Sequence, residues 1–301
     1  MSSSSEPDVV FALGPRVGRV ELQYALRSLS NLAHGRVWLI GGNPGWVVNT
    51  THVRFHDGSD KWKNIANKWR MLPSLEALSE RFVYTEDDYF ILEPVEELSA
   101  FVHPMGLDAR VKHYRRSRSG VGGWLLEARN ALAAGGYHDC PSFEVHVPML
   151  VEKSRIPLHL YAGRSMSWRS PVGATSGREP VLMARDVKVT KAEALPGAVA
   201  TGFLSSSEST FKRCGAQALL HGLFPDPCRY EKEYYMDASE MLPESSEYGA
   251  IYSDQEDSRP PNRTISVREV VARRHRLNKP NLVKLASGQW VPESGVFINE
   301  S

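Results

Sequence analysis

Short apolar runs and one-sided helical patterns alternate along the first part of the chain. The apolar runs Val9–Leu13 and Val37–Ile40 are each closed by turn-forming residues, which is typical of buried strands. Between them, leucine and alanine recur at helical spacing from Leu22 to Ala33, and Gly35 follows as a helix stop. The order strand, helix, strand predicts a parallel βαβ unit.

The same alternation continues toward the acidic residues that follow Thr85. The pattern predicts a short strand over Val53–Phe55 and a helix over Lys61–Leu72. A further helix is expected over residues 73–78, because proline suits a first helical turn. A strand follows over Arg81–Thr85. These elements together predict an α/β fold.

The rest of the chain is less periodic. We expect a helix over Leu125–Ala134, a late strand over Asp186–Val189 and a basic helix over Ser266–Leu277. Residues 244–263 are mostly polar and are expected to form a linker or surface loop. The expected organisation is a disordered tail over residues 1–7, a main domain over residues 8–235 and a C-terminal extension over residues 236–301.

Composition and charge are those of an ordinary globular protein. Of the 301 residues, 42% are hydrophobic and 24% are charged, which excludes wholesale disorder. The formal net charge is +1, so any basic surface for a nucleic acid must be local. No run approaches the roughly 20 apolar residues of a bilayer span, and the first residues lack the regions of a signal peptide. We therefore expect a cytoplasmic protein without a membrane span.

Several common chemistries lack their sequence motifs. Cys140, Cys214 and Cys228 form no CxxC or Cys/His cluster, so neither a disulfide framework nor a zinc site is indicated. No GxGxxG, GxxxxGK[ST], GxSxG or HExxH motif is present. This argues against a dinucleotide fingerprint, a P-loop, a nucleophile elbow and a zinc peptidase helix.

Three adjacent acids follow the predicted strand over residues 81–85. They are Glu86, Asp87 and Asp88, and an apolar run comes directly after them. Ligands of open α/β sheets bind outside the carboxyl ends of the strands. Carboxylates placed there can hold Mg²⁺ or Mn²⁺, which neutralises a nucleotide-sugar diphosphate. The alternative is a solvated turn after a strand.

A histidine two residues from a glutamate is the second candidate feature. In an extended segment, Glu144 and His146 would point to the same side. Such a pair could act as a base with its orienting partner, or as further metal or phosphate contacts. The alternative is a histidine satisfied in the core or on the surface.

Two basic stretches complete the candidates. The first, Arg110–Arg118, is either a solvated face or a phosphate-clamping lid, with Arg110, Lys112 and Tyr114 on one side if it is a strand. The second could contact a polyanion or an acidic partner, although no nucleic-acid-binding signature accompanies it. It comprises Arg268, Arg273, Arg274, Arg276, Lys279 and Lys284.

Several short motifs occur along the chain in the same order and with similar spacing as in a known family. They are Leu22–Leu29, Leu78–Phe90, Glu144–Pro148, Asp186–Val189, Ser206–Phe211 and Phe224–Glu231. Together they resemble Stealth-type sugar-phosphate transferases and the related glycosyltransferase-like proteins encoded by bacteriophages of actinobacteria. The resemblance covers roughly residues 8–231.

The resemblance implies a GT-A-like nucleotide-sugar fold, with a central mixed, mostly parallel sheet flanked by helices. It also implies a divalent metal on the acid cluster that holds the donor diphosphate. Asp87 and Asp88 match the acidic pair of the family, and His146 matches the histidine expected at the reaction centre.

Two departures from the family pattern bear on the reaction. Glu86 stands where Stealth members commonly carry Asn, and the first strand, Val9–Leu13, lacks the acidic residue that they carry there. These departures favour plain glycosyl transfer over sugar-1-phosphate transfer.

The sequence thus predicts a metal-dependent glycosyltransferase that moves a sugar from a nucleotide-diphosphate donor to a hydroxyl. The acceptor would be a hydroxylated base in phage DNA, a protein such as a virion protein, or a glycan, and the location would be the host cytoplasm if the chain is phage-encoded. The alternatives are a Stealth-type sugar-1-phosphate transferase and a non-catalytic sugar- or nucleic-acid-binding protein. The expected residues are Asp88, His146 and Glu144 for catalysis, Gly14, Arg16, Asn64, Lys68, Asp87 and Arg115 for donor contacts, and Glu86, Asp87 and Asp88 for Mn²⁺ or Mg²⁺.

Overall fold

The structure of the chain is a computed structural model. It describes residues 6–15, 19–116, 120–161, 166–183, 185–232, 282–284 and 290–292. The chain divides into two compact units, Met1–Ala238 and Ser239–Ser301. In the second unit the described residues form an antiparallel strand pair, β11 (Leu282–Lys284) and β12 (Trp290–Pro292). Residues 1–5 of the expected tail, the basic helix over residues 266–277 and the polar linker lie outside the described residues.

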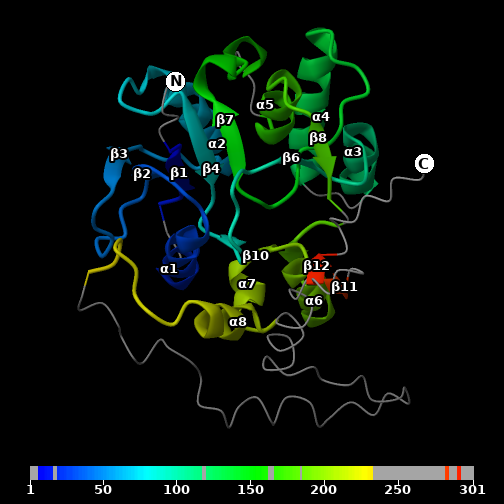
Figure 1. Ribbon diagram of the computed structural model, residues 1–301. Coiled ribbons are helices and arrows are strands. Elements are labelled where there is room, and N and C mark those ends of the chain that lie inside the picture. The colour runs from blue at the N-terminus through cyan, green and yellow to red at the C-terminus, as the bar shows by residue number, and fades with distance from the viewer. Residues whose placement is uncertain are drawn as a thin grey trace, which may run out of the picture. The chain divides into compact units, whose positions relative to one another are not determined.

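A five-stranded sheet forms the centre of the first unit (Figure 1). Its strand order is β3-β2-β1-β4-β7, in which the first four strands are parallel and β7 is antiparallel to β4. The strands are β1 (Asp8–Leu13), β2 (Val37–Gly41), β3 (Thr51–Arg54), β4 (Arg81–Thr85) and β7 (Met149–Glu152). The predicted α/β class, with a mixed and mostly parallel sheet flanked by helices, is confirmed.

Helices connect and cover these strands. Helix α1 lies between β1 and β2 in the chain, which completes the predicted parallel βαβ unit. No described helix is both long enough and apolar enough to cross a bilayer. The helices are α1 (Arg19–Ser28), α2 (Lys61–Met71), α3 (Leu107–Arg116), α4 (Gly120–Ala134), α5 (Arg169–Thr175), α6 (Leu195–Val199), α7 (Glu208–Phe211) and α8 (Ala216–Leu223).

An aromatic stack packs helix α2 against one face of the central sheet. Because side chains alternate between the faces of a strand, Val10, Ile40 and Tyr84 point into the same core cluster. Trp69 of α2 lies there with its ring centroid 4.3 Å from that of Tyr84 and 4.2 Å from that of Trp168. Aromatic pairs of this kind add about 1 kcal/mol each beyond the burial of their area. The stack therefore fixes β4, the strand that ends in the three acids.

A second, three-stranded sheet begins where β4 ends. It has the order β5-β10-β9, with β5 (Tyr89–Ile91) antiparallel and β9 (Lys188–Val189) parallel to β10 (Phe203–Ser206). A separate parallel pair joins β6 (Ala100–Val102) to β8 (Pro180–Leu182). The acidic turn links β4 directly to β5, so it joins the two sheets. The register brings Tyr89 and Lys188 to either side of Ser205.

One local prediction is wrong. Instead of a helix over residues 73–78, the chain makes a 3-10 turn at Leu72–Ser74 and continues irregularly. The sequence left the secondary structure of the first basic stretch open, and its residues 110–116 lie in helix α3, where an acid in the first turn and basic residues in the last turn suit the helix dipole. Residues 143–148 form no strand, and the strand in that region is β7.

Candidate functional site

The acidic turn lies at the carboxyl edge of the central sheet. It directly follows β4, and β1 ends beside it because the two strands are parallel, with Phe11 opposite Thr85. The backbone N–H of Tyr89 donates to the carbonyl oxygen of Glu86, at 3.3 Å, which closes the turn. This edge is where open α/β sheets bind their ligands.

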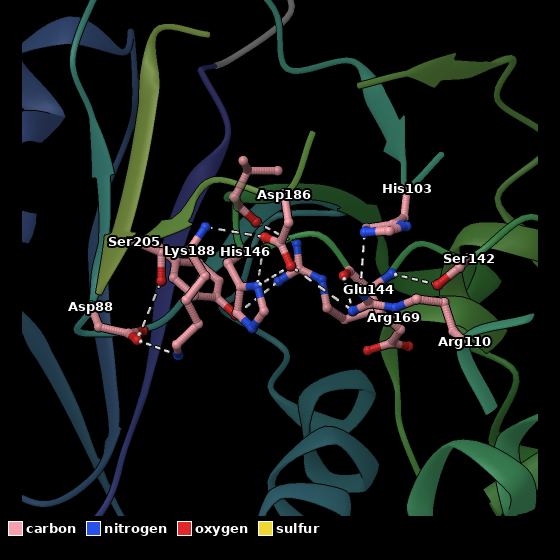
Figure 2. Close-up of polar contacts among 12 residues, drawn as sticks. Asp88, His103, Arg110, Ser142, Glu144, His146, Arg169, Asp186, Lys188 and Ser205 are labelled. Carbon is pink, nitrogen blue, oxygen red and sulfur yellow. Dashed lines mark hydrogen bonds and ion pairs between the residues drawn. The ribbon is translucent and has the colours of Figure 1, made fainter. Parts of the chain in front are cut away.

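An ion pair anchors Asp88 to the second sheet. The Nζ of Lys188 donates to Oδ2 of Asp88 at 3.2 Å, and the hydroxyl of Ser205 donates to the same oxygen at 3.4 Å (Figure 2). The other carboxylate oxygen, Oδ1, is buried and has no hydrogen-bond partner within the described part of the chain. Burial alone would lower the pKa of Lys188, but the nearby carboxylates of Asp88 and Glu86 raise it, so this side chain is a cation.

The other two acids are crowded carboxyl groups. Burial and the charges of Asp88 and Glu86 raise the pKa of Asp87 to about 7. Burial and the charge of Asp88 also raise the pKa of Glu86, while Arg169 and Lys188 oppose that shift. Negative charge is thus concentrated at this turn at an energetic cost, and it is only partly offset by built-in cations.

His146 pairs with an aspartate that lies 40 residues further along the chain. Its Nδ1 lies 2.9 Å and 3.1 Å from the two carboxylate oxygens of Asp186. Burial alone would raise the pKa of Asp186, but the hydrogen bond and charge of His146 hold it far below its ordinary value. Since this carboxylate only accepts hydrogen bonds, we assign the proton of the neutral ring to Nδ1. The Nε2 atom is then left with a lone pair that can accept a proton.

The short segment Asp186–Lys188 contributes one residue to each of the two pairs, His146–Asp186 and Asp88–Lys188. Alternate residues of an extended chain point to the same side, so Asp186 and Lys188 both face the site while Val187 is fully buried. The backbone N–H of Lys188 also donates to Oδ1 of Asp186 at 3.1 Å. One segment therefore positions His146, through Asp186, and Asp88, through Lys188 (Figure 2).

Two buried arginines fix the loop that carries His146. Arg169 donates to the carbonyl oxygen of Phe143 at 3.1 Å, to that of Val147, and to the hydroxyl of Tyr89 at 3.2 Å. Arg110 donates to the carbonyl oxygen of Glu144 at 3.0 Å. Both arginines are almost fully buried.

The arginines also connect the loop to charged groups of the site. A nitrogen of Arg110 lies 3.9 Å from Asp186, and another lies 3.0 Å from Nε2 of His103. The ring of Tyr89 meets that of His146 edge-on, with centroids 6.0 Å apart. His146 is thus placed beside the strand that follows the acidic turn.

Glu144 does not pair with His146. Its carboxylate oxygen Oε1 accepts hydrogen bonds from the hydroxyl of Ser167 and from the backbone N–H and hydroxyl of Ser170, the latter two at 3.2 and 2.9 Å. The side chain is buried among these serines and links the loop to helix α5. The expectation of a Glu144–His146 pair is corrected, and the partner of His146 is Asp186.

Two of the expected donor contacts instead hold a loop beside the site. The ammonium of Lys68 is buried, where it donates to the carbonyl oxygen of Leu13 at 2.7 Å and to Asp57 at 2.7 Å. Asn64 exchanges two hydrogen bonds with the backbone of Gly58, at 2.9 and 2.8 Å. Both side chains thus stabilise the segment after β3, and neither is an open phosphate ligand.

The other expected donor contacts lie in three different settings. Gly14 directly follows β1 at the carboxyl edge of the sheet. Arg115 is exposed on α3, and the member of its basic stretch that reaches the site is Arg110. Arg16 lies outside the described residues.

A pocket of about 550 Å³ opens at the same carboxyl edge, beyond β1, β2 and β3. It combines two histidines and an arginine with an aromatic ring, an acid and backbone of two glycines. The lining residues are Pro15, Gly41, Gly42, Asn43, His52, Arg54, Phe55, His56 and Asp57.

Helix α2 begins close to both the pocket and the acids. The carboxylate of Asp60 caps the helix by accepting from the N–H groups of Trp62 and Lys63. The charge of Lys61 in this first turn lowers the pKa of Asp87, against the larger effects that raise it. The pocket and the acidic turn are therefore neighbouring parts of one edge.

The side chains do not fit a divalent ion held by the protein. Across the described ranges, no three His, Cys, Asp or Glu side chains are arranged to hold a metal ion. One oxygen of Asp88 already binds an ammonium, and its one unpartnered oxygen does not make the set of oxygens that Mg²⁺ or Mn²⁺ requires. Glu86, Asp87 and Asp88 thus do not form a set of three protein ligands for a metal ion.

Comparisons with known proteins give weak structural likenesses. No protein-family model and no curated protein matches the chain. The apo form of the glycosyltransferase GlyE of Streptococcus pneumoniae TIGR4 is similar over 30% of this chain and 25% of that chain, with 13% identity and a TM-score of 0.21. Another structure of GlyE is similar over 35% of this chain and 31% of that chain, with 11% identity and a TM-score of 0.25. The matched part is thus a third or less of GlyE, and the TM-scores are too low to carry an argument.

Several residues of the site have no role that the sequence predicts. Asp186 and Lys188 were within a predicted strand, and their i, i+2 spacing in an extended segment was the available signal. Arg169 and Ser205 carried no local signal, because their contacts are with residues far away in the chain.

Proposed function

We propose that the chain is a glycosyltransferase that moves a sugar from a nucleotide-diphosphate donor to a hydroxyl acceptor. The observation that carries this proposal is the paired geometry at the carboxyl edge. A histidine oriented by a carboxylate and an ammonium held by another carboxylate are positioned by the single segment Asp186–Lys188.

The pocket beyond β1, β2 and β3 suits the nucleoside end of the donor. Its volume of about 550 Å³ is in the range of small-molecule sites. The ring of Phe55 offers an apolar face, and Arg54 offers a cation for a phosphate oxygen. Because the pocket and the acidic turn share one edge, a donor lying along it would bring its diphosphate toward Lys188.

His146 is the proposed general base. With its Nδ1 proton held by Asp186, its Nε2 takes the proton of the acceptor hydroxyl. The acceptor oxygen forms its bond to the anomeric carbon as the bond from that carbon to the diphosphate oxygen breaks. The nucleoside diphosphate leaves with the electron pair. Asp186 stabilises the imidazolium that forms, as carboxylates do in other histidine dyads.

The motif resemblance supports the same assignment. The resemblance implies that His146 belongs to the reaction centre and that the acids of the turn lie near the donor diphosphate, on a divalent metal. It does not identify the acceptor, and it leaves sugar-1-phosphate transfer as the competing reaction.

The test is nucleotide release from a panel of UDP-, GDP- and TDP-sugars by the full chain, with and without Mn²⁺. We expect release with at least one donor and a loss of roughly 10²–10⁴-fold in Asp186→Asn, because the base loses its orientation. His138→Ala, at an exposed position, serves as the matched control and should retain activity.

Three outcomes would count against the proposal. Absence of binding and of release with every donor would refute the donor class. Equal release by wild type and Asp186→Asn would refute the role of the dyad. A product carrying sugar plus phosphate, identified by its mass, would establish sugar-1-phosphate transfer instead.

A further inference from the structure

Lys188 lies where the donor diphosphate is expected. It forms an ion pair with Asp88, the acid that would otherwise be the main ligand of a metal cation. Its ammonium is 3.2 Å from Asp88, and its side chain remains 28% exposed. We propose, building on the function proposed above, that Lys188 is the cation that binds the donor diphosphate, so that transfer proceeds without a divalent metal.

The hydrogen bonds of Lys188 leave room for a ligand. An ammonium group has three N–H donors. Among the described residues the only hydrogen bond of its Nζ is the one to Asp88. The remaining donors and the partial exposure allow contact with phosphate oxygens while Asp88 stays bound.

The surroundings hold this ammonium in one place. The backbone N–H of Lys188 donates to Asp186, and Lys188 is opposite Ser205 in the parallel pairing of β9 and β10. Ser205 donates to the same oxygen of Asp88 that the ammonium binds. A cation positioned in advance costs no reorganisation when charge develops on a leaving group.

A divalent ion would have to compete with this arrangement. To bind Asp88 it must approach a carboxylate that is already neutralised, and it must lie next to the fixed ammonium. The described residues around it supply no group of three ligands for a metal. Asp88, with the nearby charge of Glu86, therefore serves to hold Lys188 as a cation.

The step balances with Lys188 as the cation at the leaving oxygen and with no metal ion. The bond between the anomeric carbon and the diphosphate oxygen breaks, and the oxygen keeps the electron pair. Lys188 donates hydrogen bonds to the oxygens that gain charge and keeps its protons. The proton of the acceptor hydroxyl goes to His146, and no further reactant is needed.

The test measures donor turnover and pyrophosphate binding after removal of divalent ions by EDTA. We expect the wild type to retain its turnover in EDTA and to bind pyrophosphate by calorimetry. Lys188→Met should lower both, turnover by on the order of 10²-fold, whereas Lys188→Arg should keep most of the binding. Lys191→Met, at an exposed position three residues away, is the matched control.

A rescue experiment sharpens the test. In Lys188→Met the carboxylate of Asp88 is left without its cation, so added Mn²⁺ should bind more tightly than to the wild type, as followed by electron paramagnetic resonance. Unchanged thermal melting would show that the variant is folded.

The inference and the proposed function can fail separately. Turnover by the wild type that vanishes in EDTA and returns with Mn²⁺ overturns the inference but leaves the glycosyltransferase intact. Turnover and pyrophosphate binding that are equal in Lys188→Met and the wild type also overturn it. If no donor is turned over at all, the proposed function fails. The role of Lys188 is still tested separately: pyrophosphate binding in EDTA that is lost in Lys188→Met supports it, and binding that is unchanged in this variant overturns it.

Discussion

Two aspartates at opposite ends of the central sheet differ in how their charge is satisfied. Asp8 stands at the amino end of β1, where it accepts from Arg36, from the indole N–H of Trp38 at 3.0 Å and from the backbone of Ser79 at 3.1 Å. Asp88 stands beyond the carboxyl end of β4, with one oxygen on Lys188 and one oxygen unpartnered among the described residues.

The pKa values of the two ends shift in opposite directions. At Asp8, burial alone would raise the pKa, but the hydrogen bonds from Ser79 and Arg36 outweigh it and lower the pKa. At the acidic turn, burial and mutual repulsion raise the pKa of Asp87 and Glu86. One end of the sheet therefore stabilises the fold, while the other concentrates negative charge at an energetic cost.

The largest expected effect comes from breaking the dyad at the carboxyl end. Asp186→Asn and His146→Ala should each lower turnover by roughly 10²–10⁴-fold, and the double variant should be little worse than either single variant. The two side chains act as one unit, so their effects do not add. Initial rates of nucleotide release measure this, and fully multiplicative losses would show that the residues act independently.

A smaller effect, on stability rather than activity, is expected at the amino end. Asp8→Asn places an amide NH₂ among N–H donors and should lower the free energy of unfolding by about 2–4 kcal/mol. Urea unfolding measures this change. Asp226→Asn, at an exposed position, is the control that should leave stability unchanged.

The pH dependence of the same variant tests the cause. Because the pKa of Asp8 is lowered in the folded state, its stabilising contribution is complete above its ordinary value of 3.8 and is lost as pH falls through the lowered folded value. The difference between wild type and Asp8→Asn should therefore shrink in acid. A difference that stays constant down to the acid limit would contradict this account.

The smallest expected effect has the opposite sign and lies at the acidic turn. The pKa of Asp87 is raised from 3.8 to about 7, so ionisation destabilises the folded state progressively as pH rises through that window. Asp87→Asn should be more stable than wild type at pH 8 by on the order of 1 kcal/mol, with the gain absent near pH 4. Thermal melting of both proteins at the two pH values measures this difference in stability. If Asp87→Asn is less stable than wild type at pH 8, the three acids do not destabilise one another as described.

Local pattern predicted the frame of the site well. The apolar runs of β1, β2 and β4 and the helix around Trp69 lie where expected, since strand and helix periodicity is local information. The acids after β4 were placed at the carboxyl edge by the same reasoning. The secondary structure of the basic stretch around Arg110 was harder to predict, because a run of charged residues fits both strand alternation and helical spacing.

Pairing between distant residues was not predictable from one sequence. His146 has a glutamate two residues away, yet its partner is Asp186, because the buried serines near α5 bind the carboxylate of Glu144. A lysine such as Lys68 can bind phosphate, but its ammonium instead donates to Asp57 and to the carbonyl oxygen of Leu13 at the end of β1. In each case the tertiary contact decides the role.

The most direct measurement compares nucleotide release by wild type, Asp8→Asn and Asp186→Asn under conditions where all three are folded. The account predicts release from at least one nucleotide sugar by wild type and Asp8→Asn, and its loss in Asp186→Asn. Release that is equal in all three proteins, or absent from the wild type with every donor, would contradict it.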